Sequence, residues 1–318
     1  MNLMRSHLLA SLLCVAFASA PGQGFDLKET DAAITISRGG TPVLVYHKAE
    51  DPAPDGADPA FKRSGFIHPL CAPSGATLTG IRPPDHLHHM GLWHTWVHCM
   101  FKGQETDFWN LKAKTGTVRF VKTLSCDKAD DHAAFTVEQE HVALSKDGSE
   151  TVVLREQLAI RARFEGGANV IDYTMTQKNV SDATLELPAY RYGGGVAFRA
   201  RTGWDKTNSD YLTSEGKTRL DSHQSRARWG AMFGPTEKGD ATVAILGHPS
   251  NHDAPQRLRT WGPKDNNGAI FFNFVPIQET AWAIQPGQQI TLRYQVITLD
   301  GKPDAANLEA RWKAFAEK

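Results

Sequence analysis

Short runs of alternating apolar and polar residues recur along most of the chain. Turn sequences, several of them rich in glycine, separate these runs at residues 39–40, 146–148 and 166–167. The runs with the length and alternation of β-strands are residues 33–37, 42–46, 118–124, 134–139, 151–160, 170–177, 241–246, 270–274 and 289–299.

Residues 304–318 have helical spacing instead. Leu308, Trp312 and Phe315 fall on one face of this segment, and Asp304 near its start suits the positive end of a helix dipole. No repeat, low-complexity tract or linker divides the chain. We therefore expect an all-β fold, a large antiparallel β-sandwich formed as one domain by residues 21–318, with a C-terminal helix at residues 304–318.

Two long stretches, residues 48–115 and 200–235, are not strand-like. Loops of this length in a compact domain are usually functional. Both stretches are dense in His, Trp, Arg and Asp. Candidate chemistry is therefore concentrated in these two loops.

The first 20 residues have the features of a signal peptide. Arg5 gives a positive start, residues 8–18 form an apolar run, and Ala18-Ser19-Ala20 is a small-x-small cleavage sequence. The run is about eleven residues long, whereas a membrane-spanning helix needs roughly 20. We expect residues 1–20 to be removed and the rest to be periplasmic or secreted, with no membrane span.

Charge and cysteine content narrow the function class. Lys and Arg total 35 and Asp and Glu total 35, so the formal net charge is zero, which argues against a nucleic-acid partner. Cys71, Cys99 and Cys126 follow the signal peptide; they allow at most one disulfide, and the sequence does not decide whether one forms. Cys99 has two interpretations, a buried small hydrophobe or a soft metal ligand. The composition indicates no particular oligomeric state.

Five histidines fall between residues 86 and 98, and they form the strongest cluster of candidate chemistry. In an extended segment His86 and His88 point to one face and His89 to the other. Such an H-x-H pair can chelate a metal, which makes His86 and His88 candidate ligands for one divalent ion, with Asp85 orienting a histidine. Alternatively, histidines with pKa values near 6.5 act as general acids or bases without a metal. In the same way, His94 would share a face with Trp96 and His98.

Aromatic and charged residues elsewhere supply binding candidates. Trp93 and Trp109 can stack on sugar rings, and Arg191 can bind a carboxylate with two parallel hydrogen bonds. His248 stands where a predicted strand ends. The full set of catalytic candidates is His86, His88, His89, His94, Asp107 and His248. The substrate-binding candidates are His68, Arg82, Trp93, Trp109, Asn110, Tyr190, Arg191, Asn251, Arg259 and Trp261.

Several of these segments resemble the PmoA-like family of unknown function. The motifs that carry the resemblance are residues 63–69, 73–75, 83–93 with His86, His88 and His89, 107–110, and 248–251, and the likeness extends from about Phe25 to Ala316. It implies an exported bacterial protein with a fold like the galactose-mutarotase-like supersandwich, in which a concave sheet face binds sugar. The methane-oxygenase label of that family is not carried over, because such a subunit spans a membrane.

The resemblance leaves one catalytic group unassigned. Glu279 and Asp253 match the late glutamate of sugar epimerases by position only, so epimerase activity is not implied. The leading hypothesis is an exported carbohydrate-active enzyme, a lyase or hydrolase that acts on a glycan or glycoside through the histidines. The alternatives are a metal-dependent oxygenase or redox enzyme, and a carbohydrate-binding protein without catalysis.

Overall fold

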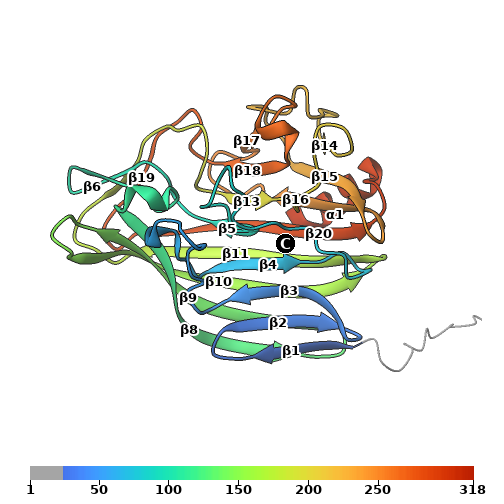
Figure 1. Ribbon diagram of the computed structural model, residues 1–318, viewed down its shortest axis with the longest axis horizontal. Coiled ribbons are helices and arrows are strands. Elements are labelled where there is room, and N and C mark those ends of the chain that lie inside the picture. Colours follow the sequence, from blue (N-terminus) through green and yellow to red (C-terminus); the bar gives the residue numbers. More distant parts are fainter. Residues whose placement is uncertain (1–23) are drawn as a thin grey trace, which may run out of the picture.

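Two eight-stranded antiparallel sheets pack face to face in the computed structural model, which describes residues 24–318 (Figure 1). The predicted signal peptide lies outside the described residues. The first sheet has the order β1 (Phe25–Glu29), β2 (Ala33–Arg38), β3 (Thr41–His47), β4 (Phe66–Leu70), β5 (Leu92–His94), β13 (Val196–Arg199), β18 (Phe271–Val275) and β17 (Arg257–Thr260). The second has the order β14 (Asp210–Thr213), β15 (Trp229–Thr236), β16 (Gly239–Gly247), β20 (Gln289–Asp300), β11 (Ala168–Asn179), β10 (Glu150–Glu165), β9 (His132–Leu144) and β8 (Gly116–Lys128).

Smaller elements cover parts of the sandwich. The 3-10 helices are η1 (Pro59–Phe61), η2 (Leu111–Ala113) and η3 (Asn266–Gly268), and a third sheet has the order β19 (Trp282–Ile284), β12 (Leu185–Leu187), β6 (Cys99–Phe101) and β7 (Gln104–Thr106). The helix α1 (Ala305–Ala316) packs Leu308 and Phe315 against Trp229 and Ile297, on the face of the second sheet turned away from the first. No helix in residues 24–318 has the length and apolar character needed to cross a bilayer.

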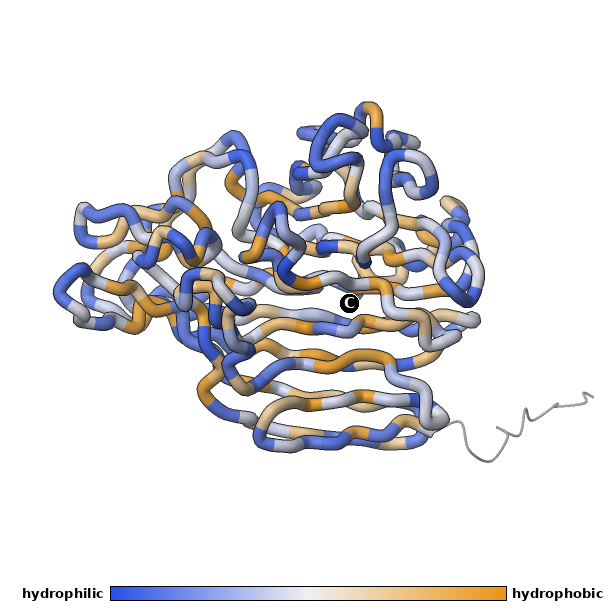
Figure 2. Tube along the Cα trace, viewed as in Figure 1, coloured by the Kyte–Doolittle hydropathy of each residue, from blue (hydrophilic) through white to orange (hydrophobic). Residues whose placement is uncertain are grey.

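Alternation along the strands builds the core between the sheets. Ile34 and Ile36 of β2 are fully buried, and they belong to the same cluster as Val137 of β9 and Leu158 and Ile160 of β10. Hydrophobic positions follow the strands, whereas the loops are mostly hydrophilic (Figure 2). Burial of these apolar faces, at roughly 25 cal/mol per Å² removed from water, is the main stabilising contribution to the fold.

The predicted fold class is confirmed, and all nine predicted strands occur. The predicted helix is present as α1, with Asp304 as its N-cap, since the carboxylate accepts the amide of Ala306 at 2.9 Å. Cys71, Cys99 and Cys126 are free, and Cys99 is a buried core residue.

The description of residues 48–115 and 200–235 as strand-free is wrong. Strands β4 to β7 lie in the first stretch, and β14 with most of β15 lies in the second. All three residues of β5 are buried, because loops cover the outer face of the first sheet there. A strand that is buried on both faces shows no alternation, so the pattern could not reveal it.

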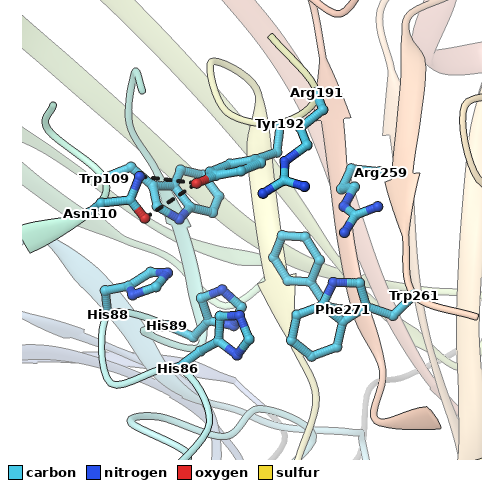
Figure 3. A pocket seen from close by; sticks show the side chains of 10 residues that line it. All are labelled: His86, His88, His89, Trp109, Asn110, Arg191, Tyr192, Arg259, Trp261 and Phe271. Carbon is cyan, nitrogen blue, oxygen red and sulfur yellow. Dashed lines mark hydrogen bonds between the residues drawn. The ribbon is translucent and has the colours of Figure 1, made fainter. Parts of the chain in front are cut away.

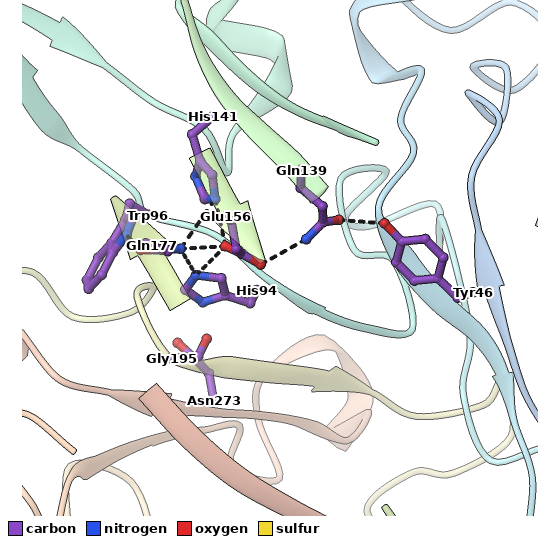
Figure 4. Close-up of polar contacts among 9 residues, drawn as sticks. All are labelled: Tyr46, His94, Trp96, Gln139, His141, Glu156, Gln177, Gly195 and Asn273. Atoms are coloured by element: carbon purple, nitrogen blue, oxygen red, sulfur yellow. Dashed lines mark hydrogen bonds and ion pairs between the residues drawn. The ribbon is translucent and has the colours of Figure 1, made fainter. Parts of the chain in front are cut away.

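A polar network inside the sandwich ties the two sheets together (Figure 4). His94 of β5 lies 3.5 Å from Glu156 of β10, and both side chains are buried. The Glu156 carboxylate accepts hydrogen bonds from Gln139 at 2.8 Å, His141 at 2.9 Å and Gln177 at 2.5 Å. Burial would raise the pKa of Glu156, but His94 and His141 and the bonds from His141 and Gln177 outweigh burial and lower it. Glu156 is therefore an ionised, fully bonded carboxylate in the core.

This bonding predicts a large stability loss for Glu156→Ala. The substitution leaves buried donors on Gln139, His141 and Gln177 without an acceptor, at about 1–3 kcal/mol each. We expect urea unfolding to show a loss of at least about 3 kcal/mol. Glu150→Ala on the same strand removes an exposed ion pair with Arg119 and should cost less than about 1 kcal/mol. Equal, small losses for both variants would contradict the role given to Glu156.

Candidate functional site

A small pocket of about 120 Å³ opens on the outer face of the first sheet (Figure 3). Two neighbouring residues of β18 show this position: Phe271 lines the pocket, whereas Phe272 points into the sandwich core. Figure 3 shows the histidines on one side of the pocket and two arginines on the other. The lining residues are His86, His88, His89, Trp109, Asn110, Arg191, Tyr192, Arg259, Trp261 and Phe271.

Two consecutive turns bring the three histidines together. The amide of His86 bonds the carbonyl of Pro83 at 2.9 Å, and the amide of His89 bonds that of His86 at 3.0 Å. The His89 ring centroid then lies 4.7 Å from that of His86 and 4.8 Å from that of His88. The prediction that an extended segment points His89 away from the other two is therefore wrong, because residues 83–89 fold into turns.

Aromatic side chains support the histidines from below. Trp93 is fully buried, with its ring 5.2 Å from His89 and 5.0 Å from Trp109, so it packs beneath the pocket and does not line it. Trp109 and Trp261 line the pocket but are almost fully buried. The stacking surface predicted for Trp93 and Trp109 is therefore limited to the exposed edges of Trp109, Trp261 and the half-buried Tyr192.

Asp107 holds a turn and does not line the pocket. Its Oδ1 accepts the amides of Trp109 and Asn110, both at 2.8 Å, and its Oδ2 accepts the Asn110 side chain at 2.7 Å. The same Asn110 amide reaches the Tyr192 hydroxyl at 3.0 Å. Burial, together with Tyr190 and Asp107, raises the pKa of Tyr192 to about 12. The Tyr192 hydroxyl is therefore protonated at neutral pH.

Burial favours the neutral form of two histidines of the pocket, and a carboxylate orients the third. Burial, followed by the nearby His86 and Arg63, lowers the pKa of His88 to about 4, and burial lowers the pKa of His89 well below its usual value. His88 is therefore neutral at pH 7. The carboxylate of Asp85 meets His86 Nδ1 at 2.8 Å and Arg199 at 3.2 Å. This contact fixes the orientation of the His86 ring.

Positive charge faces the histidines across the pocket. Arg191 and Arg259 form no ion pair within residues 24–318; Arg191 lies 5.6 Å over the Tyr192 ring, and Arg259 contacts His223 at 3.0 Å. Among the described residues that line the pocket there is no Asp or Glu. The charge of Asp265 acts on Arg259, but neither guanidinium is engaged in an ion pair, which makes the pocket suited to an anionic ligand.

Two predicted residues lie on the opposite side of the molecule. His248 contacts Ser250 at 2.7 Å and packs 5.1 Å from Phe315 of α1. Asn251 exchanges hydrogen bonds with the backbone of Arg293, at 2.9 and 2.7 Å. These contacts fasten the loop that follows β16 to strand β20 and helix α1. The structure therefore does not bring His248 and Asn251 to the pocket.

Other predicted residues lie near the pocket with structural partners. His68 contacts the Thr79 hydroxyl at 2.9 Å, and Arg82 forms a 2.6 Å ion pair with Asp51. Tyr190 stacks on His98 at 4.8 Å, at the rim beside Tyr192. His94 points into the core, away from the pocket. The epimerase candidates are paired as well, Glu279 with Arg257 at 2.7 Å and Asp253 with Arg226 at 3.0 Å.

The residues closest to a metal-ligating arrangement are in the core. Among the described residues, His94, His141 and Glu156 offer ligand atoms that all lie within 4.8 Å of one another, and the predicted ligands His86 and His88 belong to no such group of three. The Gln177 amide nitrogen occupies the middle of this group, 2.6 Å from His94 and 3.3 Å from His141. The Trp96 indole fixes that amide by donating to its oxygen at 2.8 Å. Because the Gln177 amide nitrogen lies between the possible ligand atoms, the arrangement fits a hydrogen-bond network better than a metal site.

Sequence reasoning missed Tyr192, Phe271 and Arg199, whereas Asp85 contacts a histidine, His86, as expected. Tyr192 stands two residues after Tyr190, so alternation from the chosen Tyr190 would have placed it on the same side. Phe271 and Arg199 carried no signal, because a buried phenylalanine and an isolated arginine are ordinary in strands.

Comparison with known families and structures gives a family match and distant likenesses. The model of a family of unknown function, DUF6807, matches residues 33–313. No curated protein matches the chain. A galactose mutarotase related enzyme from Lactobacillus acidophilus is 10% identical, with 86% of this chain and 96% of that chain covered and a TM-score of 0.41.

Two larger enzymes are similarly distant. A GH36 α-galactosidase from Geobacillus stearothermophilus is 11% identical, with coverages of 90% and 41% and a TM-score of 0.35. A polysaccharide lyase is 9% identical, with coverages of 90% and 34% and a TM-score of 0.36. The chain thus spans about a third to two fifths of their length.

Two half-buried histidines of the outer face predict that the protein loses stability in mild acid. Burial lowers the pKa values of His68 and His88 to about 4, whereas a histidine in the unfolded chain titrates near 6.5. The unfolded chain therefore binds more protons between these values, so their contribution to stability is complete above about pH 6.5 and is lost as the pH falls toward 4. We expect the free energy of unfolding, measured in urea, to fall steadily from pH 7 to 4.5. His68→Gln should reduce this slope; a flat profile would contradict the buried neutral state.

Proposed function

The chain belongs to the DUF6807 family, and we propose that its pocket is the active site of an exported carbohydrate-active enzyme of the lyase type. The observation that carries this proposal is the combination of neutral His88, protonated Tyr192 and the unpaired Arg191 and Arg259 in one pocket. Such a set suits proton transfer on an acidic sugar. The substrate we propose is a glycan that contains a uronic acid.

The lining supports elimination over hydrolysis. Most glycosidases use two carboxyl groups, one as an acid and the other as a base or nucleophile. The described residues that line this pocket include neither Asp nor Glu, and Asp107 is occupied by its turn. Elimination needs a base, an acid and a cation beside the sugar carboxylate, and all three are present.

The proposed reaction is an elimination, so water is not consumed. Arg191 and Arg259 bind the uronate carboxylate and stabilise the negative charge that develops on it. Neutral His88 takes the proton from C5, the electron pair of that bond forms the C4=C5 double bond, and the bond between C4 and the glycosidic oxygen breaks. Tyr192 donates its proton to the departing oxygen, and the proton on His88 returns to Tyr192 through solvent. The products are an unsaturated uronate and a shortened chain.

Positioning residues complete the assignment. Asn110 holds the Tyr192 hydroxyl, and Asp85 holds the His86 ring beside His88. The edges of Trp109 and Trp261 offer apolar contact to one face of the sugar. The oxygenase alternative has less support, because His86 and His88 belong to no three-ligand cluster and His86 already contacts Asp85.

The proposal predicts that His88→Ala abolishes turnover without unfolding the protein. A base positioned for proton transfer contributes about 10²–10⁴-fold to the rate. We expect kcat on polygalacturonate, alginate or chondroitin, followed by ultraviolet absorbance of the new double bond, to fall by at least about 100-fold. His98→Ala is the matched control, since His98 belongs to the same histidine segment but contacts Glu105 outside the pocket.

Other outcomes distinguish the alternatives. New reducing ends without the double bond would make the enzyme a hydrolase and contradict the elimination. Tight uronate binding without turnover would leave a carbohydrate-binding protein. If His88→Ala lost activity and also unfolded at a much lower temperature than the wild-type protein, the histidines would be structural.

A further inference from the structure

A second cavity adjoins the histidine pocket. Its volume is about 290 Å³, and it lies between residues 80–85, residues 199–205 and the turn at residues 266–269. The histidine pocket alone, at about 120 Å³, is below the roughly 300–1,000 Å³ of usual ligand sites, whereas the two cavities together fall within that range. If one sugar ring occupied the histidine pocket, the second cavity would therefore leave room for a neighbouring sugar.

Side-chain contacts of one ion pair connect the linings of the two cavities, which share no residue. Asp85 and Arg199 line the second cavity, and their side chains meet at 3.2 Å. Behind them, His86 and Trp261 line the first pocket; Asp85 contacts His86 at 2.8 Å, and Arg199 lies 4.7 Å over the Trp261 ring. A chain that entered both cavities would pass the ion pair of Asp85 and Arg199 next to His86.

The second cavity has the lining expected of a site for hydroxyl groups. Asn266 and Asn267 expose side-chain amides at its edge, and Thr202 adds an exposed hydroxyl. Trp204 is almost fully buried beneath it. Amide and hydroxyl groups both donate and accept hydrogen bonds, as sugar hydroxyls require.

We propose that this second cavity is a further sugar subsite, so that the substrate is an oligomer whose scissile linkage crosses the ion pair of Asp85 and Arg199. The inference rests on the proposed carbohydrate-binding function of the histidine pocket. It assigns Asp85 a positioning role, since its carboxylate lines the second cavity and orients His86, which lines the first pocket, beside the linkage. The enzyme would then act on oligosaccharide or polysaccharide chains and not on single sugars.

The test is the dependence of binding on chain length. Calorimetric titration of the full chain in the His88→Ala background, which prevents turnover, would use galacturonate and mannuronate monomers, dimers and trimers. We expect the dimer of the better series to bind at least tenfold more tightly than its monomer. A tenfold difference corresponds to about 1.4 kcal/mol. Equal affinities for monomer and dimer, or no uronate binding, would overturn the second subsite.

A filling variant locates the extra binding. Thr202→Trp places a large ring at the second cavity, at an exposed position, and it should reduce dimer affinity to that of the monomer while monomer affinity stays within twofold. Leu220→Trp is the matched control, because Leu220 is 81% exposed and lines neither cavity.

A gentler variant covers the case in which Thr202→Trp does not fold. Asn267 has a left-handed backbone (φ 57°), which glycine adopts readily, so Asn267→Gly removes the amide without strain. It should weaken the dimer and not the monomer. Unchanged dimer binding in folded Thr202→Trp would refute the assignment. These readouts are affinities, so absence of turnover would contradict the lyase proposal and leave the subsite proposal intact.

Discussion

The buried carboxylate of Glu156 is the constraint on which the arrangement of the site depends. A charge inside a sandwich core is tolerated only when hydrogen bonds replace water, and here the donors come from β9 and β11, while His94 approaches from the first sheet. His94 must therefore point inward. Because side chains alternate along a strand, Trp93 must point outward, where it supports His89 and Trp109. A slip of one residue in β5 would exchange these faces and remove both the network and the pocket floor.

The pocket combines groups that a hydrolytic site seldom has. Burial favours the neutral form of His88 and His89, and Arg191 and Arg259 form no ion pair among the described residues, although the charge of Asp265 acts on Arg259. A neutral base and a fixed positive charge cooperate when the substrate itself brings the negative charge. The carboxylates nearby are used elsewhere: Asp107 holds the turn of Trp109 and Asn110, and Asp85 holds His86. This division of roles is why an acidic sugar accounts for the pocket better than a neutral one.

Much of the sandwich could be predicted, because its long strands have one face in the core and one in solvent, as Ile34 and Ile36 show in β2. The short strands that carry the site could not, since β5 is buried on both faces and shows no alternation. The histidine cluster was identified by its density, but its geometry depends on turns that a strand-like interpretation of residues 86–89 misses. His248 follows a strand end as active-site residues often do, yet it lies beneath α1 because chain position does not say which sheet face a loop serves.

The most direct test of the account is a crystal structure of the His88→Ala variant with a uronate trisaccharide. We expect one uronate carboxylate between Arg191 and Arg259, its ring beside Trp109 and Tyr192, and the next sugar beyond Asp85 and Arg199. A trisaccharide bound at another surface, or in this pocket with its carboxylate turned away from both arginines, would contradict the assignment of an acidic glycan to this site.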